Sequence, residues 1–495
     1  MSTTGLQLIA NKPTYRRLPE AFYARVDPTP VSAPELLALN RPLARQLGLD
    51  ADALTDPEAV AVLAGNRSPV GSEPLALAYA GHQFGAFVPK LGDGRAVLLG
   101  EIMGRDGARR DVQLKGAGKT PYSRRGDGRA PLGPVVREYL AGEAMAGLGI
   151  PTTRALAAVT TGETVFRPHP EPGAVLVRVA SSHIRIGTFE YAAQRGEGAV
   201  RLLADYVISR HAPDLADAGH PYRALLDHIA TLTAELVASW MLVGFIHGVM
   251  NTDNISVAGE TIDYGPFAFM DRYHPRTVFS SIDTGGRYAF NQQPRIAAWN
   301  LARLAETMLP LLGDRQDDAV SAAESSLERF ADRFQTRYDA GLGQKIGLSE
   351  QRAGDAELAA ALLAEMARAG ADYTLAFRRL SNLSHEPSPA DDGFRALFDS
   401  APELEAWLSS WRERLGAETR RDDERRAAMR AVNPAFVLRT HLADGAATAA
   451  ARGDRKPMDD LLAVLSDPFS DHPELGDYGR PPAPNEAITR TFCGT

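Results

Sequence analysis

The chain has almost no cysteine, with one residue among 495. A single cysteine excludes a disulfide bond within the chain, and it excludes zinc and iron–sulfur sites built from several cysteines. The sequence also lacks an excess of positive charge, since 54 lysines and arginines stand against 62 aspartates and glutamates and the net charge is −8. Nucleic-acid coats and polybasic membrane binders need a positive surface, so the composition argues against both kinds of partner.

Long apolar runs are also missing. The most apolar stretch, residues 236–250, is interrupted by Ser239, Gly244 and His247 and is shorter than the roughly 20 residues that cross a bilayer. The N-terminus shows no charged segment followed by an apolar one, which argues against a signal peptide. We therefore expect a cytoplasmic protein that acts neither on nucleic acid nor at a membrane.

What remains is the composition of a globular protein, with 44% apolar and 23% charged residues. Short β-branched runs at residues 96–99, 111–115 and 174–179 alternate with glycine-rich turns, and helical periodicity dominates from about residue 190. The expected helices cover residues 33–47, 134–148, 198–210, 222–245, 296–312, 319–342, 355–369 and 403–429. Strands followed by helices predict an α+β protein with two lobes.

The same changes in composition divide the chain into four parts. We expect an N-terminal segment over residues 1–80 and a strand-rich lobe over 81–185. A helical lobe over 186–345 is expected to carry the metal site, and a C-terminal helical extension with a tail follows over 346–495.

A glycine-rich turn precedes the first of these strands. Gly92 and Gly94 lie on either side of an aspartate, and glycine lets backbone N–H groups approach phosphate oxygens closely. Most turns of this composition are ordinary hairpins, so the pattern alone is a weak indication of a phosphate site.

The run at residues 111–115 ends in Lys115. It is similar to the strand of protein kinases that carries the lysine gripping ATP, although an exposed lysine at the end of a strand fits the same pattern. The following Gly-Ala-Gly-Lys-Thr suggests a P-loop, but Gln113 stands where that motif needs glycine.

The helix expected at residues 134–148 offers two acidic partners for this lysine, since a helix glutamate pairs with it in kinases. Glu143 lies among apolar positions of the helix, whereas Glu138 lies on the opposite face. The pattern favours Glu143 as the buried partner, and it also allows either residue to be a solvated surface charge.

The most specific motif begins at His247, reaches Asn254 and continues nine residues later with Asp263 in an Asp-Tyr-Gly triplet. It is similar to the kinase pattern His-Arg-Asp-Leu-x-x-x-Asn followed by Asp-Phe-Gly, with a hairpin between the two parts. Asn254 and Asp263 offer the oxygen ligands that suit Mg²⁺. The position of the kinase catalytic aspartate holds Val249, and Asp253 is the nearest carboxylate.

Two arginines, Arg178 and Arg185, lie seven residues apart at the expected junction of the lobes. A guanidinium group binds phosphate oxygens through two hydrogen bonds. Arginines are also common in purely structural positions, so this pair gains weight only beside the other motifs.

Taken together, these segments resemble the selenoprotein O family, the kinase-like protein adenylyltransferases. The similarity covers nearly the whole chain and includes residues 18–23, 79–85, 113–116, 137–139, 149–156 and 247–263. Cys493 fits as well, because members of this family carry a cysteine or selenocysteine near the C-terminus. Since the chain has no second cysteine, any redox control through Cys493 would have to be intermolecular or use a small thiol.

The resemblance implies a pseudokinase fold that binds ATP in an inverted orientation. It implies transfer of AMP to serine, threonine or tyrosine hydroxyls of protein substrates, with release of pyrophosphate. The nucleotide contacts that it implies are Gly92, Gly94, Arg95, Lys115, Asp127, Gly128, Arg178, Arg185 and Asp263. It further implies that Glu138 pairs with Lys115, that Asn254 and Asp263 hold Mg²⁺ or Mn²⁺, and that Asp253 accepts the proton.

Three alternatives remain open from the sequence. The first is a UMP transferase that uses UTP, and the second is a true protein phosphotransferase with Asp253 as its base. The third is a nucleotide-binding scaffold without activity. The joint presence of Lys115, Asn254 and Asp263 argues against the scaffold, because a binder without activity does not need a metal pair.

Overall fold

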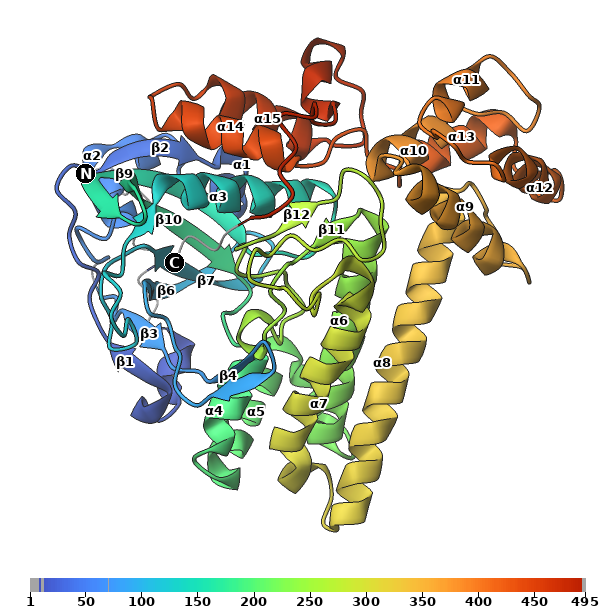
Figure 1. Ribbon diagram of the computed structural model, residues 1–495. Helices are drawn as coiled ribbons and strands as arrows, with labels where there is room; N and C mark the ends of the chain where they lie inside the picture. Colours follow the sequence, from blue (N-terminus) through green and yellow to red (C-terminus); the bar gives the residue numbers. More distant parts are fainter. Residues whose placement is uncertain (1–8, 10–12, 70, 492–495) are drawn as a thin grey trace.

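The computed structural model of the chain describes residues 9, 13–69 and 71–491 (Figure 1). Cys493 lies outside the described residues. The strands of the main sheet lie within the first 180 residues, and helices dominate the rest of the described chain. The architecture is thus mixed α and β, with the sheet ahead of most helices in the chain, as the sequence predicts.

The main sheet has eight strands in the order β1-β3-β6-β7-β10-β9-β2, with β8 paired to β10, and its neighbours are antiparallel. Its strands are β1 (Tyr23–Arg25), β2 (Glu35–Leu39), β3 (Leu75–Leu77), β6 (Ala96–Met103), β7 (Arg109–Lys115), β8 (Ala130–Pro131), β9 (Arg154–Phe166) and β10 (Pro170–Ala180). The three predicted strand runs lie within β6, β7 and β10 and are confirmed.

Each face of the sheet packs against different helices. Helix α3 (Leu132–Gly147) covers the face that includes Leu176, whereas α1 (Arg41–Gln46) and α2 (Pro57–Leu63) cover the face that includes Val177. Because side chains alternate along a strand, every second residue of β7 and β10 points toward α3. Lys115 lies opposite Leu176 in the register, so the strand pattern places this lysine on the α3 face.

The prediction of one helix over residues 33–47 was wrong in its first half. Residues 35–39 form strand β2, which pairs with β9, and α1 begins only after Asn40. The side-chain Oδ1 of Asn40 accepts a hydrogen bond from the backbone N–H of Leu43 at 3.1 Å, which caps the helix. Pairing with a buried strand outweighs the helix propensity of the leucines and alanine in this segment.

Helices make up most of the described chain after the sheet. The bounds are α4 (Ile186–Ala193), α5 (Glu197–His211), α6 (Pro221–Leu242), α7 (Gln293–Leu312), α8 (Gln316–Lys345), α9 (Asp355–Ala369), α10 (Tyr373–Leu380), α11 (Ala390–Arg395), α12 (Leu404–Gly416), α13 (Asp422–Arg430), α14 (Thr440–Ala450) and α15 (Lys456–Ser466). The predictions that correspond to α5, α6, α7, α8 and α9 are confirmed, and the helical block expected over residues 403–429 consists of α12 and α13. The sequence analysis did not predict α4, α10, α11, α14 and α15. Figure 1 shows α6, α7 and α8 running side by side, while α14 and α15 lie against α3.

Helix α6 is long and apolar enough, by length and composition, to cross a membrane. In the structure, 67% of its most apolar window is buried, and it packs against α7 and α8. Its contacts within the helical part of the protein therefore account for its apolar composition.

Candidate active site

Three charged side chains meet between the sheet and α3. Glu138 of α3 forms an ion pair with Lys115 at the end of β7, and its second oxygen accepts a hydrogen bond from Nε of Arg178 on β10 at 2.6 Å. Glu138 and Arg178 are buried, and Lys115 is nearly so. Burial, together with repulsion from Arg178, lowers the pKa of Lys115 to about 8. The Glu138 carboxylate is thus shared by the Lys115 ammonium and the Arg178 guanidinium at a largely buried site.

The structure pairs Lys115 with Glu138, as the family resemblance implies, and the argument for Glu143 was wrong. The carboxylate of Glu143 accepts hydrogen bonds from Nε and Nη2 of Arg154 at 2.8 and 2.6 Å. Apolar neighbours do not distinguish the faces of α3, because the sheet covers one side of this helix and α14 and α15 cover the other. The face with Glu138 is the one that packs on the sheet.

Asp263 joins the same cluster from the helical part of the chain. Its Oδ1 accepts a hydrogen bond from Nη2 of Arg178 at 2.8 Å, and its Oδ2 forms an ion pair with Arg185. Burial alone would raise the pKa of Asp263, but attraction to Arg185 and Arg178 outweighs burial and holds that pKa well below its usual range. Asp263 is therefore ionised at neutral pH.

Asp253 lies in the short helical turn Thr252–Asn254 and is buried. Its Oδ2 accepts a hydrogen bond from Nε2 of Gln83 at 3.3 Å, while its Oδ1 has no hydrogen-bond partner. The backbone of Gly81 passes so close that a Cβ there would lie 2.5 Å from this Oδ1. Burial raises the pKa of Asp253 to about 6, so its carboxylate is mostly ionised at neutral pH and can accept a proton.

The segments of Asn254 and Asp263 are tied together by hydrogen bonds. The side-chain amide nitrogen Nδ2 of Asn254 donates to the backbone carbonyl oxygen of Val249 at 3.0 Å. Nε2 of His247 lies 2.9 Å from the backbone carbonyl oxygen of Ile262. His247 is fully buried. We conclude that His247 positions Ile262, the residue before Asp263. The hairpin predicted between Asn254 and Asp263 is reduced to one antiparallel bridge, which joins Ile255 to Thr261.

The oxygen atoms in this region fit a divalent cation. Asn254 offers an amide oxygen and Asp263 an ionised carboxylate. These are the donors that Mg²⁺ and Mn²⁺ take. No group of three or more His, Cys, Asp or Glu residues is placed to hold a metal anywhere in the described chain, so phosphate oxygens would have to complete the coordination.

The glycine-rich turn has a packing requirement of its own. Gly92 has φ +102°, and a Cβ there would lie 2.5 Å from the ring of Tyr122. A Cβ on Gly94 would lie 3.0 Å from the carbonyl oxygen of the same tyrosine. The carbonyl of Arg95 then accepts the backbone N–H of Gly116 at 2.7 Å. This contact joins the turn to the end of β7, directly after Lys115.

The other two residues of the implied nucleotide site, Asp127 and Gly128, are held by contacts outside the ion-pair cluster. The carboxylate of Asp127 pairs with Arg167 at 2.8 Å, near the turn between β9 and β10. Gly128 has φ +74°, and a Cβ there would lie 2.1 Å from the carbonyl carbon of Gly118. Their contact with a nucleotide stays a prediction.

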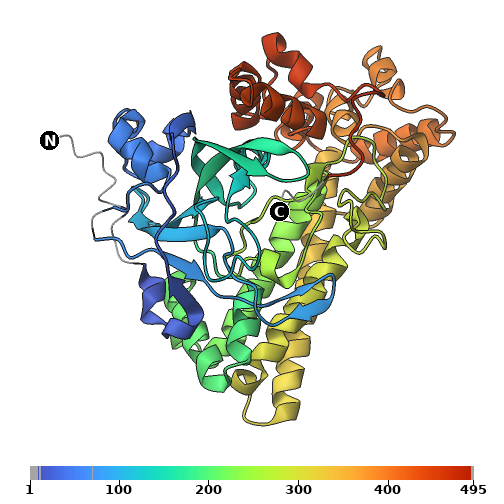
Figure 2. The ribbon, with the colours of Figure 1, turned by 60° about the vertical axis from the view of Figure 1, so that its left-hand side comes forward.

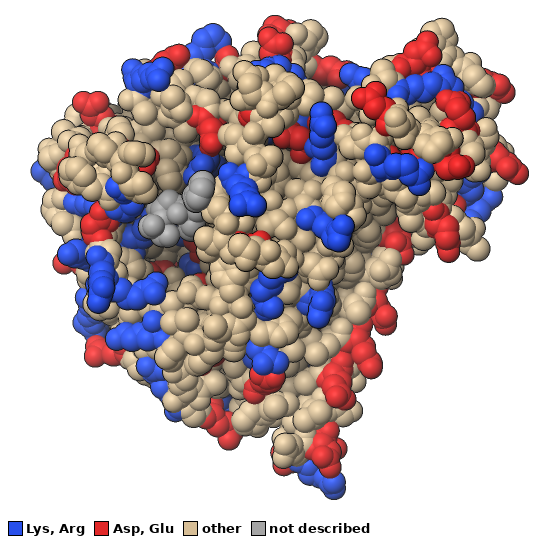
Figure 3. Space-filling view, viewed as in Figure 1, with Lys and Arg blue, Asp and Glu red and all other residues tan. Residues whose placement is uncertain are grey.

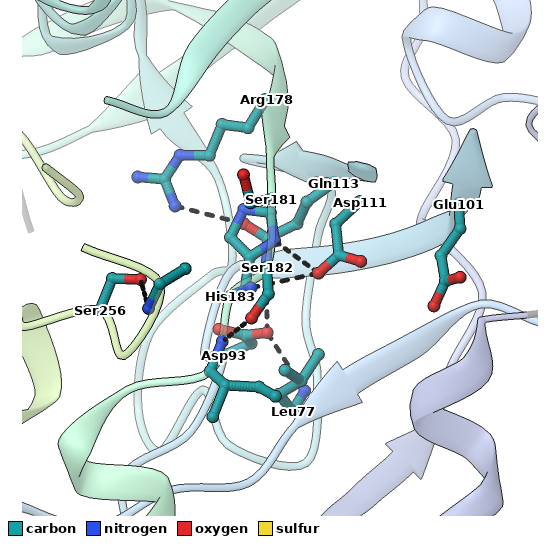
Figure 4. Close-up of polar contacts among 12 residues, drawn as sticks. Leu77, Asp93, Glu101, Asp111, Gln113, Arg178, Ser181, Ser182, His183 and Ser256 are labelled. Carbon is teal, nitrogen blue, oxygen red and sulfur yellow. Dashed lines mark hydrogen bonds and ion pairs between the residues drawn. The ribbon is translucent and has the colours of Figure 1, made fainter. Parts of the chain in front are cut away.

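Behind the cluster lies a buried polar network that the sequence analysis missed. Oδ2 of Asp111 accepts the backbone N–H of His183 at 3.1 Å, and its Oδ1 accepts Nη2 of Arg210 at 2.7 Å. Figure 4 shows Asp111 pointing toward His183, and Arg178 reaching toward Gln113. The available signal was Asp111 itself, a carboxylate on the same strand face as Gln113 and Lys115. The network fixes the turn that leads from β10 to Arg185.

We expect Glu138→Ala to destabilise the protein strongly, because the substitution leaves two buried cations without their shared carboxylate. Removing one partner of a buried ion pair typically costs about 3–5 kcal/mol. Glu143→Ala is the matched control on the same helix, since its partner Arg154 reaches solvent. Thermal unfolding of both variants tests this, and equal losses of stability would contradict the account of Glu138.

Comparison with known proteins gives a consistent result. A sequence model of a family, described as protein adenylyltransferase SelO, matches residues 6–466 of the chain. Proteins named protein nucleotidyltransferase YdiU are similar over 484 residues, which is 97% of this chain and 98% of each relative. The identity is 58% for the protein of Bradyrhizobium sp. (strain ORS 278), 57% for that of Rhodopseudomonas palustris (strain BisB5) and 58% for that of Alkalilimnicola ehrlichii. The match with the family includes every residue of the candidate site.

Proposed function

The chain belongs to the SelO family of protein adenylyltransferases, and we propose that it transfers AMP from ATP to serine, threonine or tyrosine hydroxyls of proteins, releasing pyrophosphate. Membership of this family makes it a nucleotidyltransferase. The choice of AMP, the acceptor hydroxyls and the role of each site residue belong to the proposal.

The observation that carries the proposal is the meeting of Lys115, Arg178 and Arg185 in one buried cluster around Glu138 and Asp263. Buried cations bind phosphate oxygens strongly, because water does not compete for them. We assign these three side chains to the β- and γ-phosphates of an inverted ATP. The turn with Gly92, Gly94 and Arg95, together with Asp127 and Gly128, would complete the nucleotide site.

In this orientation the reacting atoms would lie near Asp253, whose backbone carbonyl oxygen accepts a hydrogen bond from Nη1 of Arg185 at 2.7 Å. The hydroxyl oxygen of the acceptor attacks the α-phosphorus of ATP and passes its proton to Oδ1 of Asp253, which has no hydrogen-bond partner in the described chain. The bond between the α-phosphorus and the bridging oxygen breaks, and pyrophosphate leaves with its charge neutralised by Lys115, Arg178 and Arg185. When bound, a cation on Asn254 and Asp263 supplies further positive charge to the phosphates.

Val249 favours this direction of transfer. A kinase needs an aspartate at that position to orient the hydroxyl that attacks the γ-phosphorus, and valine cannot accept a proton. The carboxylate that remains is Asp253, four residues later.

We also propose that the architecture is kinase-like, with the pseudokinase arrangement that the family resemblance implies. The sheet strands from β6 to β10, with α3, would form the strand-rich lobe over residues 81–185, and α4 to α8 the helical lobe over 186–345. Residues 1–80, which add β1, β2 and β3 to the same sheet, and residues 346–495 would be additions to the two lobes. The ion pair between a strand lysine and a helix glutamate supports this arrangement.

Transfer of UMP from UTP is the second candidate, because the similar proteins are named nucleotidyltransferases without a stated base. Intact mass spectrometry of the protein and its acceptors after incubation with ATP, UTP and Mg²⁺ or Mn²⁺ distinguishes the candidates. We expect the mass of an AMP residue to be added. Addition of UMP alone would support the second candidate, and addition of phosphate alone would contradict both.

A further inference from the structure

A hollow of about 600 Å³ opens where the loop before α7 meets that helix. Three arginines and a tryptophan are prominent in its lining, namely Arg276, Arg287, Arg295 and Trp299. Arg276 and Arg295 are exposed, and Arg287 and Trp299 are half-buried. We call these four residues the arginine pocket. None of them belongs to the cluster that we assign to ATP.

The surroundings of the arginine pocket are strongly positive within an acidic protein. Residues 272–303 contain five arginines and a single acidic residue, Asp283, although the whole chain carries a net charge of −8. The carboxylate of Asp283 accepts the backbone N–H groups of Arg287 and Tyr288 at 2.9 and 2.8 Å. Figure 3 shows several Lys and Arg side chains, with few acidic ones among them, over the loops ahead of α7.

The arginines of the pocket keep their charge available for a ligand. Within the part of the chain that the structure describes, Arg276, Arg287 and Arg295 form no ion pair with a carboxylate. The guanidinium of Arg287 instead lies 4.7 Å from the ring centre of Trp299. Stacking on an aromatic ring orients a guanidinium without neutralising it. The pocket thus presents oriented positive charge beside an aromatic wall.

The pocket adjoins the segment that carries Asp253. The hydroxyl of Tyr288 donates to Oδ1 of Asn251 at 2.6 Å, and the backbone N–H of Phe84 donates to the same oxygen at 3.0 Å. Phe84 follows Gln83, whose amide contacts Asp253. The neighbour of Tyr288 in the chain is Arg287, so three hydrogen bonds between segments hold the pocket next to the segment of the proposed base.

A small hairpin forms the rim between the two sites. It consists of β4 (Gly81–Gln83) and β5 (Ala86–Val88), and His82 packs against Trp299 with ring centres 5.3 Å apart. Figure 2 shows this hairpin extending from the sheet toward the long helices. Phe84 and Phe87 remain 36% and 44% exposed on it. Exposed aromatic residues and arginines are enriched where proteins bind other proteins.

We propose that the arginine pocket binds an acidic segment of the acceptor protein, close to the hydroxyl that receives AMP. The inference rests on the proposed function and names its substrate class. Aspartate and glutamate carboxylates complement free guanidinium groups and bind them through two hydrogen bonds. The exposed phenylalanines of the hairpin would cover the apolar part of the same segment. A protein segment fits better than a second nucleotide, because exposed apolar side chains of the hairpin lie beside the pocket.

Binding of two fluorescent peptides, measured by anisotropy without nucleotide, tests the inference. One peptide has a central serine flanked by glutamates, and the other has glutamine at those positions. We expect the glutamate peptide to bind at least about tenfold more tightly, which corresponds to about 1.4 kcal/mol. The double variant R287Q/R295Q should lose this preference, while the matched control R67Q/R420Q should keep it, since these arginines are exposed elsewhere on the protein.

A second double variant, R276Q/R295Q, alters only exposed side chains and replaces R287Q/R295Q in the test if that variant does not fold. It too should weaken binding of the glutamate peptide. Equal affinity for the two peptides, or undiminished binding of the glutamate peptide by both pocket variants, would overturn the inference. Displacement of the peptide by ATP at saturation would also overturn it, because the pocket would then belong to the nucleotide site.

The binding measurement separates this inference from the proposed function. If the wild-type protein prefers the glutamate peptide but adds no nucleotide to any hydroxyl, the proposed function fails and the docking surface stands. If AMP transfer occurs and the two peptides bind equally, the docking surface fails alone.

Discussion

Asp253→Asn is expected to lower kcat for AMP transfer by about 10²–10⁴, the usual contribution of a positioned general base. Asparagine has the same shape as aspartate, so it keeps the close approach of Gly81 and the contact with Gln83. It cannot take up the proton of the acceptor hydroxyl. Because Asp253 is not assigned to the nucleotide, the KM for ATP should change little. Steady-state kinetics with one acceptor protein measures both values.

Asp391→Asn is a control for the loss of a buried carboxylate. Asp391 is also fully buried, but it lies on α11 and pairs with Arg412. We expect this control to affect stability and leave kcat near that of the wild type. If Asp253→Asn retained a normal kcat in a folded protein, another group would have to be the base.

Asp263→Asn is expected to lower the transfer rate by about 10²–10³, the range found when one electrostatic contact to a transition state is removed. Asp263 has φ +58°, and asparagine adopts this left-handed conformation more readily than most residues. The substitution therefore removes the charge with little backbone strain, whereas alanine would add strain. Rates measured over a titration of Mg²⁺ or Mn²⁺ should show both a lower maximum and a higher metal requirement.

Binding of ATP should survive the same substitution. Arg178 retains Glu138 as a partner, and Arg185 retains Asp93 at 3.8 Å. Loss of the Asp263 charge releases Nη2 of Arg178 and Nη1 of Arg185 from their ion pairs with that carboxylate, so these nitrogens can meet phosphate oxygens. Calorimetric titration with ATP checks this, and an Asp263→Asn variant with unchanged rate and unchanged metal requirement would remove Asp263 from the metal site.

The sequence predicted the elements of the site better than the contacts between them. Alternation along β7 and β10 is enough to bring Lys115 and Arg178 to one face of the sheet. The choice between Glu138 and Glu143 was beyond the helical pattern, because α3 is covered on two sides and shows apolar residues around most of its circumference.

The features that the sequence analysis did not predict depend on contacts between segments far apart in the chain. Residues 35–39 form a strand only because β9 lies beside them. The hairpin of β4 and β5 contacts Asp253 across a separation of 170 residues in the chain, and no local pattern indicates such a contact. The arginine-rich stretch before α7 was visible in the composition, but its place beside Asn251 and Asp253 depended on the fold.

The direction of transfer from ATP is the central claim, and one labelling experiment tests it most directly. The protein is incubated with Mg²⁺ or Mn²⁺ and with ATP labelled at either the α- or the γ-phosphate, and incorporation into the protein and its acceptors is measured. We predict that the α-label enters protein and that the γ-label appears in released pyrophosphate. Incorporation of the γ-label, with the α-label remaining in free nucleotide, would contradict the account.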